Sequence, residues 1–269
     1  MRATVLSDNI PWEGLEGEWG LSIYITHQDR RILLDSGASG LFLENADKLG
    51  IDLTQVDYAV LSHGHPDHSN GMEDFFRAAE GVPFYVRPGC DSCYIRREDG
   101  IGYGGIPRGA AERFGDRLVF VEGDFSPSPG VWLIPHKTPG LAAQGAADGM
   151  YTRRGGALEA DDYAHEQSLV VETERGLVIF NSCSHAGADN IIREVGETFP
   201  GQRLLALVGG FHLFRRTDEE VRALARRIRD TGIAAIYTGH CTGERGLELL
   251  REELGEMVHP FRTGLVMEF

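Results

Sequence analysis

Short apolar runs, each bounded by glycine, proline or aspartate, recur along the whole chain. They are rich in valine, isoleucine, leucine and aromatic residues, which is typical of β-strands. The first nine residues predict one short strand. The other predicted strands cover residues 21–26, 31–34, 56–61, 83–86, 118–121, 131–134, 168–172, 177–180, 204–208, 234–237 and 264–268. Two of these, 168–172 and 177–180, are spaced like the arms of a hairpin.

Three other segments have apolar residues at the spacing of an amphipathic helix. The clearest is TDEEVRALARRIRDTG, residues 217–232, in which Thr217 and Glu220 have the spacing of a capping box and Gly232 is a stop signal. The other two are residues 39–50 and 243–255. Strands and helices are therefore mixed throughout, which favours a layered α/β fold with mixed sheets. We expect residues 1–269 to form a single domain.

Residues 138–166, TPGLAAQGAADGMYTRRGGALEADDYAHE, break this pattern because they are rich in glycine and alanine and have no sustained period. A connection of this length without secondary structure of its own is usually a functional loop or a mobile segment. We expect a lid or substrate loop here, with a disordered insert as the alternative.

Composition narrows the class of protein. The 269 residues include 26 basic and 41 acidic ones, for a formal net charge of -15. Such a charge disfavours non-specific binding of nucleic acid, although local arginines could still hold a small anion. There is no apolar run of membrane-spanning length and no signal peptide, and the four cysteines are too scattered for a disulfide framework. These features predict a cytoplasmic protein with no membrane or nucleic-acid partner.

The sequence LSHGHPDHSNG, residues 61–71, places three histidines and an aspartate directly after a predicted strand. Imidazole and carboxylate groups are ligands suited to zinc, iron or manganese. His63 and His65 can converge on one ion, and Asp67 and His68 can face a second. The alternative is a polar surface loop that binds nothing, but four ligand groups in six residues after a buried strand favour a metal site.

Other residues of interest lie further along the chain. His212 follows a strand and the pair Gly209–Gly210, so it could bind substrate or supply a proton, or it could be an ordinary core or surface histidine. Cys90 and Cys93 form a C-x-x-C without a second pair at zinc-ribbon spacing, which favours buried small apolar residues. Cys241 adjoins His240 and, if that segment is extended, points the opposite way.

Several motifs in order resemble the metallo-β-lactamase superfamily. They are the histidine loop, ILLDSG with Asp35, VIFNSCSHAG, and YTGHCTG with His240. The resemblance implies a four-layer αββα sandwich with the metals at one edge and Asp35 orienting the histidine loop. EWGLSIYI, SCSHAG and GGFHL look most like the dihydropterin–ribofuranosylaminobenzene phosphate synthase-like branch. The usual loop of that branch is closer to HGHYDHTGG, and the residues that differ here are not ligands.

The resemblance also suggests a ligand set for two divalent metal ions, with zinc as the first choice and manganese or iron as alternatives. Cys183 and His136 are alternatives to His185, or could join it. The expected ligands are His63, His65 and His185 for one metal, and Asp67, His68 and His240 for the other.

Two metals in such a site would ionise a bound water and polarise the bond under attack. Asp67 could hold the nucleophile and accept its proton. We therefore expect a hydrolase of an ester, lactone or phosphoester in a small metabolite, which could carry a phosphate. The branch name instead implies a pterin-condensing synthase. A non-catalytic sensor or an iron-containing redox protein is a third interpretation. The sequence does not predict the oligomeric state.

Overall fold

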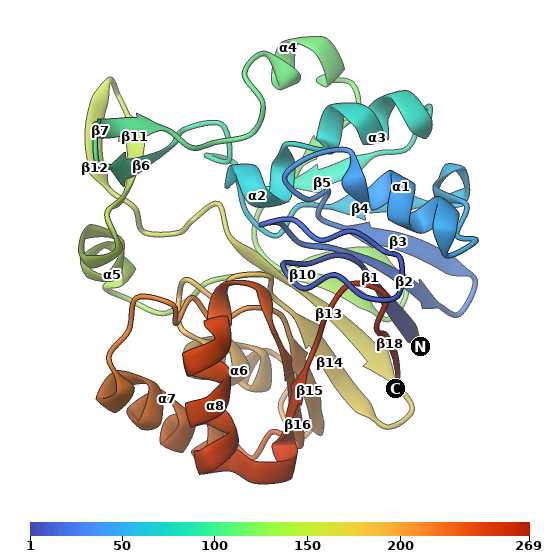
Figure 1. Ribbon diagram of the computed structural model, residues 1–269. Helices are drawn as coiled ribbons and strands as arrows, with labels where there is room; N and C mark the ends of the chain where they lie inside the picture. Colours follow the sequence, from blue (N-terminus) through green and yellow to red (C-terminus); the bar gives the residue numbers. More distant parts are fainter. The chain divides into compact units, whose positions relative to one another are not determined.

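The structure is a computed structural model that describes residues 1–269 (Figure 1). The chain divides into two compact units, and each is assembled from separate stretches of sequence. The first unit contains residues 1–123, 139–167 and 262–268, and the second contains residues 124–138, 168–261 and 269. The single domain expected from the sequence stays a prediction.

The main sheet of the first unit has seven strands, and every strand predicted for this part of the chain is present in it. The strands from β3 to β8 run parallel, so their carboxyl ends lie at the same edge. In spatial order the seven strands of this sheet are β18 (Val266–Glu268), β1 (Arg2–Ser7), β2 (Ser22–His27), β3 (Arg30–Leu34), β4 (Tyr58–Val60), β5 (Phe84–Val86) and β8 (Leu118–Phe120).

Aromatic side chains form much of the core between this sheet and its helices. Phe75 and Phe76 of helix α3 (Met72–Ala78) contact Phe84 of β5 edge to face, with ring centroids 5.9 Å away in each case. Phe42 of the predicted helix α1 (Leu41–Lys48) belongs to the same buried cluster. Three shorter helices of this unit are η1 (Leu53–Gln55), α2 (Pro66–Ser69) and α4 (Ala110–Phe114).

The segment 138–166 has secondary structure of its own, so the expectation of a structureless connection is wrong. Its elements are α5 (Leu141–Asp148), β11 (Met150–Arg154) and β12 (Ala157–Ala160). These strands form a four-stranded sheet, in the order β12, β11, β6 (Cys93–Arg97) and β7 (Gly100–Tyr103). The pairing of β11 with β6 joins residues more than fifty positions apart, and a local pattern cannot reveal it. The role as a lid stays a prediction.

The second unit contains the other seven-stranded sheet. The predicted hairpin is confirmed, because β13 and β14 pair antiparallel. From β14 to β17 the strands are parallel, and their carboxyl ends share one edge. In spatial order the strands are β17 (Val258–Pro260), β16 (Ala235–Thr238), β15 (Leu204–Val208), β14 (Gly176–Phe180), β13 (Gln167–Thr173), β10 (Val131–Pro135) and β9 (Phe125–Ser128).

Helices connect the parallel strands of this sheet. The predicted helices α7 (Asp218–Asp230) and α8 (Gly243–Leu254) are both present, and they pack against each other. Helix α6 (Ala188–Thr198) was missed, because it begins after Gly187 without a side-chain cap and so has no start signal. The short helices η2 (His240–Thr242) and η3 (Gly255–Met257) complete the unit.

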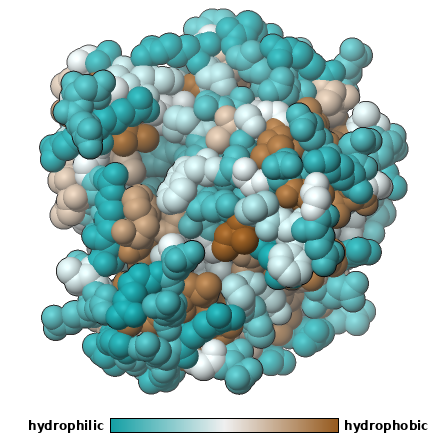
Figure 2. All heavy atoms as spheres, viewed as in Figure 1, coloured by the Kyte–Doolittle hydropathy of each residue, from teal (hydrophilic) through white to brown (hydrophobic).

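The surface agrees with the acidic composition. Most of the face seen in Figure 2 is hydrophilic, and the exposed large apolar residues include Trp12, Trp19 and Phe120. None of the helices combines the length and the apolar character needed to cross a membrane.

The capping box of α7 gives a direct test of the local sequence signals. The Thr217 side chain accepts a hydrogen bond from the Glu220 N–H, and the Glu220 carboxylate accepts one from the Thr217 N–H. Thr217→Ala should lower the free energy of unfolding by about 1 kcal/mol in a denaturant titration. Glu219→Gln, an exposed change in the same helical turn, should stay within about 0.5 kcal/mol of the parent. Equal effects of the two changes would contradict the capping role.

Candidate metal centre

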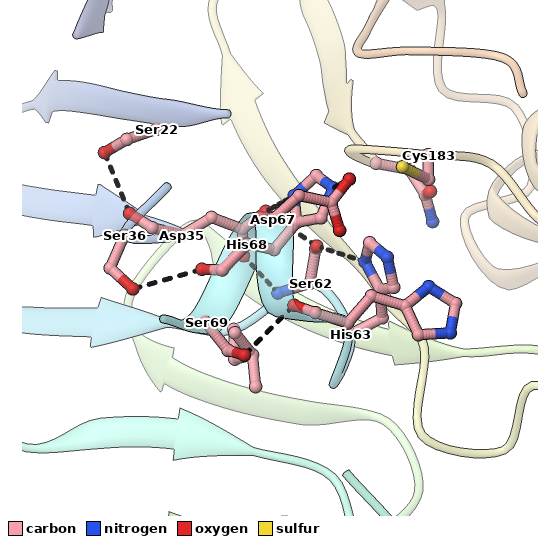
Figure 3. Close-up of polar contacts among 12 residues, drawn as sticks. Ser22, Asp35, Ser36, Ser62, His63, Asp67, His68, Ser69 and Cys183 are labelled. Atoms are coloured by element: carbon pink, nitrogen blue, oxygen red, sulfur yellow. Dashed lines mark hydrogen bonds and ion pairs between the residues drawn. The ribbon is translucent and has the colours of Figure 1, made fainter. Parts of the chain in front are cut away.

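The histidine loop follows β4 and is buried despite its polar sequence (Figure 3). His63 and His68 are 0% exposed and His65 is 3% exposed. Pro66 occupies the first turn of α2, so the loop passes directly into a helix that carries Asp67 and His68. Gly64 is required by close approach, because a Cβ there would lie 2.4 Å from the Cys90 carbonyl oxygen.

Asp35 holds this loop from the end of β3. Its buried carboxylate accepts hydrogen bonds from the Ser62 N–H at 2.7 Å, the Ser62 hydroxyl at 2.7 Å and His68 Nδ1 at 2.9 Å (Figure 3). Asp35 has a φ of 58°, a left-handed conformation that is strained for a residue other than glycine. The orienting role that the family resemblance implied for Asp35 is therefore confirmed.

These hydrogen bonds fix which imidazole nitrogens carry protons. The Ser62 hydroxyl donates to Asp35, so at its 2.8 Å contact with His63 it accepts from Nδ1–H. His68 likewise donates its Nδ1–H to Asp35. The Nδ1 atoms of His63 and His68 are therefore both held in hydrogen bonds, which leaves the two Nε2 atoms as the positions for a metal.

The four ligand groups of the loop come together within the first unit. Ring centroids lie 4.6 Å apart for His63 and His65, and 4.3 Å apart for His63 and His68. An Asp67 carboxylate oxygen lies 3.5 Å from His68 Nε2. Buried imidazole nitrogens beside a carboxylate are the donor chemistry that a divalent transition metal requires, so these residues fit one.

The electrostatic surroundings agree with this fit. Burial lowers the pKa of His65 to about 3, with a contribution from His165, so at neutral pH this ring keeps a lone pair. Burial also opposes a charge on His68, but Asp67 and Asp35 outweigh it and raise the pKa of His68 to about 10. Two carboxylates therefore stabilise positive charge at this position.

A second support of the loop was missed by the sequence analysis. The Gly64 N–H donates to His165 Nδ1 at 3.2 Å, and His165 Nε2 bonds the Asp161 carboxylate at 3.0 Å. Asp161 and His165 belong to the segment that was expected to be a lid, and no motif marked them. The two residues therefore brace the loop backbone from within the same unit.

Cys93 lies beside this pair. Cys90 and Cys93 are buried, as predicted. The Cys93 thiol, however, is within 4.8 Å of ligand atoms of His65, Asp161 and His165. The interpretation of Cys93 as a small apolar residue therefore describes its burial but not its polar neighbours.

In the second unit, the remaining candidates sit at the ends of three adjacent parallel strands. Cys183 and His185 follow β14, His212 follows β15, and His240 and Cys241 follow β16. The rings of His185 and His212 have centroids 4.5 Å apart. Ser184, His212 and His240 all have left-handed φ, with values of 51°, 50° and 48°. Strain repeated at three strand ends is typical of a functional site.

The two cysteines of this unit are in contact. Their sulfurs lie 3.5 Å apart, and the His212 N–H donates to Cys241 Sγ at 3.2 Å. Residues 240–242 form a helical turn, so the extended segment assumed for Cys241 is not present. Burial raises the pKa of the Cys241 thiol, but the hydrogen bond with Cys183 and the neighbouring His240 and His212 outweigh burial and lower that pKa well below its ordinary value.

His136 is placed differently from the other candidates. Its Nδ1 bonds a Glu194 carboxylate oxygen at 3.0 Å, and His136 belongs to no group of closely spaced ligand atoms. Glu194 also accepts hydrogen bonds from the Lys137 N–H, the Thr138 N–H and the Thr138 hydroxyl. The contact between His136 and Glu194 therefore joins helix α6 to the segment that follows β10, and we assign His136 this structural role.

Comparison with known proteins defines the class. The metallo-β-lactamase superfamily model matches residues 20–146. A crystal structure of Tm1679, a metal-dependent hydrolase of the β-lactamase superfamily, is 30% identical, covers 100% of this chain and 99% of its own, and superposes with a TM-score of 0.86. The chain belongs to the metallo-β-lactamase superfamily, and the fold class expected from the motifs is confirmed.

The comparison also finds a relative that carries the name of the branch that the motifs resemble. The 7,8-dihydropterin-6-methyl-4-(β-D-ribofuranosyl)-aminobenzene-5'-phosphate synthase of Methanocaldococcus jannaschii is 25% identical over 89% of this chain and 85% of its own. Zinc-bound PqqB from Methylobacterium extorquens shares the fold at a TM-score of 0.59 and 12% identity, and each chain is covered over 100% of its length.

The Glu194 network predicts acid-sensitive stability. Burial raises the pKa of Glu194, but hydrogen bonds from His136, Thr138 and Lys137 lower it to about 2. A folded-state pKa below the unfolded value stabilises the fold above about pH 4.5, and this contribution is lost as the pH falls towards 2. The shift corresponds to about 3 kcal/mol.

Glu194→Gln should therefore lower the free energy of unfolding at pH 7, and its difference from the parent should shrink in denaturant titrations between pH 5 and pH 3. Glu197→Gln, an exposed change on the same helix, serves as the control and should show no such trend. A pH-independent deficit in Glu194→Gln would contradict the assignment.

Asp35→Asn should reverse the proton arrangement of the histidine loop. The amide NH₂ would face Ser62 Oγ, so the Ser62 hydroxyl would donate to His63 Nδ1 and move the ring proton to Nε2. The loss of a carboxylate should also lower the pKa of His68. Nitrogen-15 NMR of the metal-free protein distinguishes the two tautomers.

The matched control for this experiment is Ser36→Ala, which removes a hydrogen bond to the His68 carbonyl without touching an imidazole. It should leave the tautomers unchanged. Retention of Nδ1–H on His63 in the Asp35→Asn variant would show that Asp35 does not set the tautomer.

Proposed function

We propose that the protein is a dinuclear metal-dependent hydrolase that acts on an ester, lactone or phosphoester of a small metabolite. The observation that carries the proposal is the buried histidine loop, whose rings direct Nε2 away from an aspartate and a serine that hold Nδ1. Imidazole nitrogens gathered at one buried position beside a carboxylate are the donors that zinc and similar metals bind. The description of Tm1679 as a metal-dependent hydrolase agrees with this function.

The proposed ligands are the six residues expected from the sequence. His63, His65, Asp67 and His68 are supported by their geometry within the first unit. His185 and His240 are retained on the family resemblance. The donor set suits zinc first, with manganese or iron as alternatives, because imidazole and carboxylate ligands accept all three.

When bound, the metals would lower the pKa of a water molecule and polarise the bond under attack. The Asp67 side chain is 23% exposed and would accept a hydrogen bond from the attacking water, and so hold it and take its proton. Asp35 and Ser62 would keep His63 and His68 in the tautomer that ligation needs. His212 would bind the substrate or supply a proton to the leaving group.

A second candidate function is synthesis. The M. jannaschii relative is named as a 7,8-dihydropterin-6-methyl-4-(β-D-ribofuranosyl)-aminobenzene-5'-phosphate synthase, and it aligns with 89% of this chain. Release of diphosphate from a dihydropterin diphosphate, dependent on the ribosylated amine, would identify that chemistry. Hydrolysis of test lactones and phosphoesters without an amine would instead identify the protein as a hydrolase. A cytoplasmic location and the lack of nucleic-acid partners stay predictions.

Removal of loop ligands tests the proposed function. His63→Ala and Asp67→Ala should each reduce the metal content below about two ions per chain in elemental analysis and lower the hydrolysis rate by about a thousandfold or more, since a bound metal supplies several kcal/mol of transition-state stabilisation. His259→Ala removes an imidazole that belongs to no ligand group and should keep both properties. Full activity after chelation and removal of all metal would rule out the proposal.

A further inference from the structure

The first unit contains a cavity that shares no residue with the candidate metal centre. Its volume is about 430 Å³, within the range of about 300–1,000 Å³ that is usual for small-molecule sites. Three segments form it: the loop that follows β1, the end of α1 and the residues that lead into β18. The lining includes Trp12 and Leu15 from the first segment, Lys48 and Leu49 from the second, and Arg262 and Val266 from the third.

A tight turn holds Trp12 at this cavity. The Leu15 N–H donates to the Trp12 carbonyl oxygen at 2.9 Å, and Glu13 and Gly14 between them have φ values of 46° and 85°. Two successive positive φ values are typical of a type I′ turn, and the first is strained for a glutamate. Lys48 Nζ donates to the Gly14 carbonyl oxygen at 3.1 Å, which ties the turn to α1. The turn therefore fixes Trp12 although 45% of this residue is exposed.

Apolar side chains line the interior of the cavity. Leu15 is 8% exposed, and a Cβ at Gly264 would lie 2.5 Å from its Cδ1, so a glycine is needed where the C-terminal segment passes this leucine. Leu49 and Val266 extend the apolar lining. An indole ring beside such a lining is a preformed surface for a flat apolar group.

Two cations without carboxylate partners line the same cavity. The Arg262 guanidinium lies over the Trp12 ring, with its Cζ 3.8 Å from the ring centroid. Its Nε is buried and has no hydrogen-bond partner. Lys48 bonds only the Gly14 carbonyl oxygen, although the chain has 41 acidic residues. Glu13 is the one carboxylate among the lining residues and is exposed to solvent, so the lining keeps an excess of positive charge.

A plainer interpretation is that Arg262 only clamps the C-terminal segment onto Trp12 through a cation–π contact. That interpretation accounts for the stacking. It does not account for the buried Nε–H without an acceptor, or for the second cation at the same cavity. A buried donor without a partner is costly, and a carboxylate or phosphate oxygen would supply the acceptor. A guanidinium matches the geometry of both of these groups.

We propose that this cavity binds a small organic anion that has a flat apolar body. Arg262 and Lys48 hold its carboxylate or phosphate group, and the apolar body lies against Trp12 and the leucine side chains. The proposal goes beyond the proposed hydrolysis and does not depend on it, because the cavity contains none of the candidate metal ligands. Loss of metal from the histidine loop should therefore leave this binding unchanged.

Nuclear magnetic resonance of the full-length, nitrogen-15-labelled protein tests the site, because the chain has three tryptophans and each gives one indole N–H signal. The probes are 2-naphthoate, which is flat and anionic, and its neutral counterpart 2-naphthamide. We expect 2-naphthoate to shift the Trp12 signal, which Trp12→Phe identifies, with a Kd of about 1 mM or below. The Trp132 signal should not move, because this side chain does not line the cavity.

The neutral probe and one variant test the role of the charge. 2-Naphthamide should bind at least about tenfold more weakly than 2-naphthoate, because it cannot form the charged hydrogen bonds. Arg262→Gln should weaken the binding of 2-naphthoate by a similar factor. Arg108→Gln is the matched control, since it removes a guanidinium that lies over the Tyr103 ring at 4.0 Å, and it should leave the titration unchanged.

The comparison of the two probes uses the unmodified protein, so it requires no variant to fold. A Trp12 signal that does not move with 2-naphthoate would overturn the proposal. Equal affinity for the anionic and the neutral probe would also overturn it, and so would unchanged affinity for 2-naphthoate in folded Arg262→Gln.

Discussion

The carboxylate of Asp35 is fully buried, and three donors from the histidine loop satisfy it. A hydrogen bond to a charged group contributes about 1.5–3 kcal/mol, and an unpaired buried carboxylate costs more than that. The loop therefore has one low-energy position, in which the Ser62 backbone and the His68 ring both face Asp35. Because Ser62 passes the constraint on to His63, a single charge orients two candidate ligands.

In both units, the residues of interest follow the ends of parallel strands. Asp35 and the histidine loop follow the parallel strands β3 and β4, while Cys183, His212 and Cys241 follow β14, β15 and β16. Parallel strands bring residues that are distant in sequence to one edge, and the turns that follow can be held in strained conformations by the sheet. Left-handed residues occur at several of these turns, including Asp35, His212 and His240. Strain is thus concentrated where donor atoms converge.

Local signals in the sequence predicted much of this. Apolar runs located every strand of the two large sheets except β9 and β17, the Thr217 capping box located α7, and HGHPDH located the loop, because each signal lies within a few residues. The features that the sequence did not predict depend on contacts between residues that are distant in the chain. The β11–β6 pairing, the brace from His165 to Gly64 and the contact of Cys183 with Cys241 join positions that no local period relates. His136 had the right residue type, but Glu194 holds it elsewhere.

The central claim is that the imidazoles held by Asp35 and Ser62 coordinate metal through Nε2. Anomalous diffraction at the zinc edge, from crystals grown with Zn²⁺, tests this most directly. The account predicts anomalous peaks at about 2.0–2.1 Å from Nε2 of His63 and of His68, the distance of a zinc–imidazole bond. Well-ordered rings with no anomalous peak within about 3 Å of either nitrogen, well beyond any zinc–nitrogen bond, would contradict it.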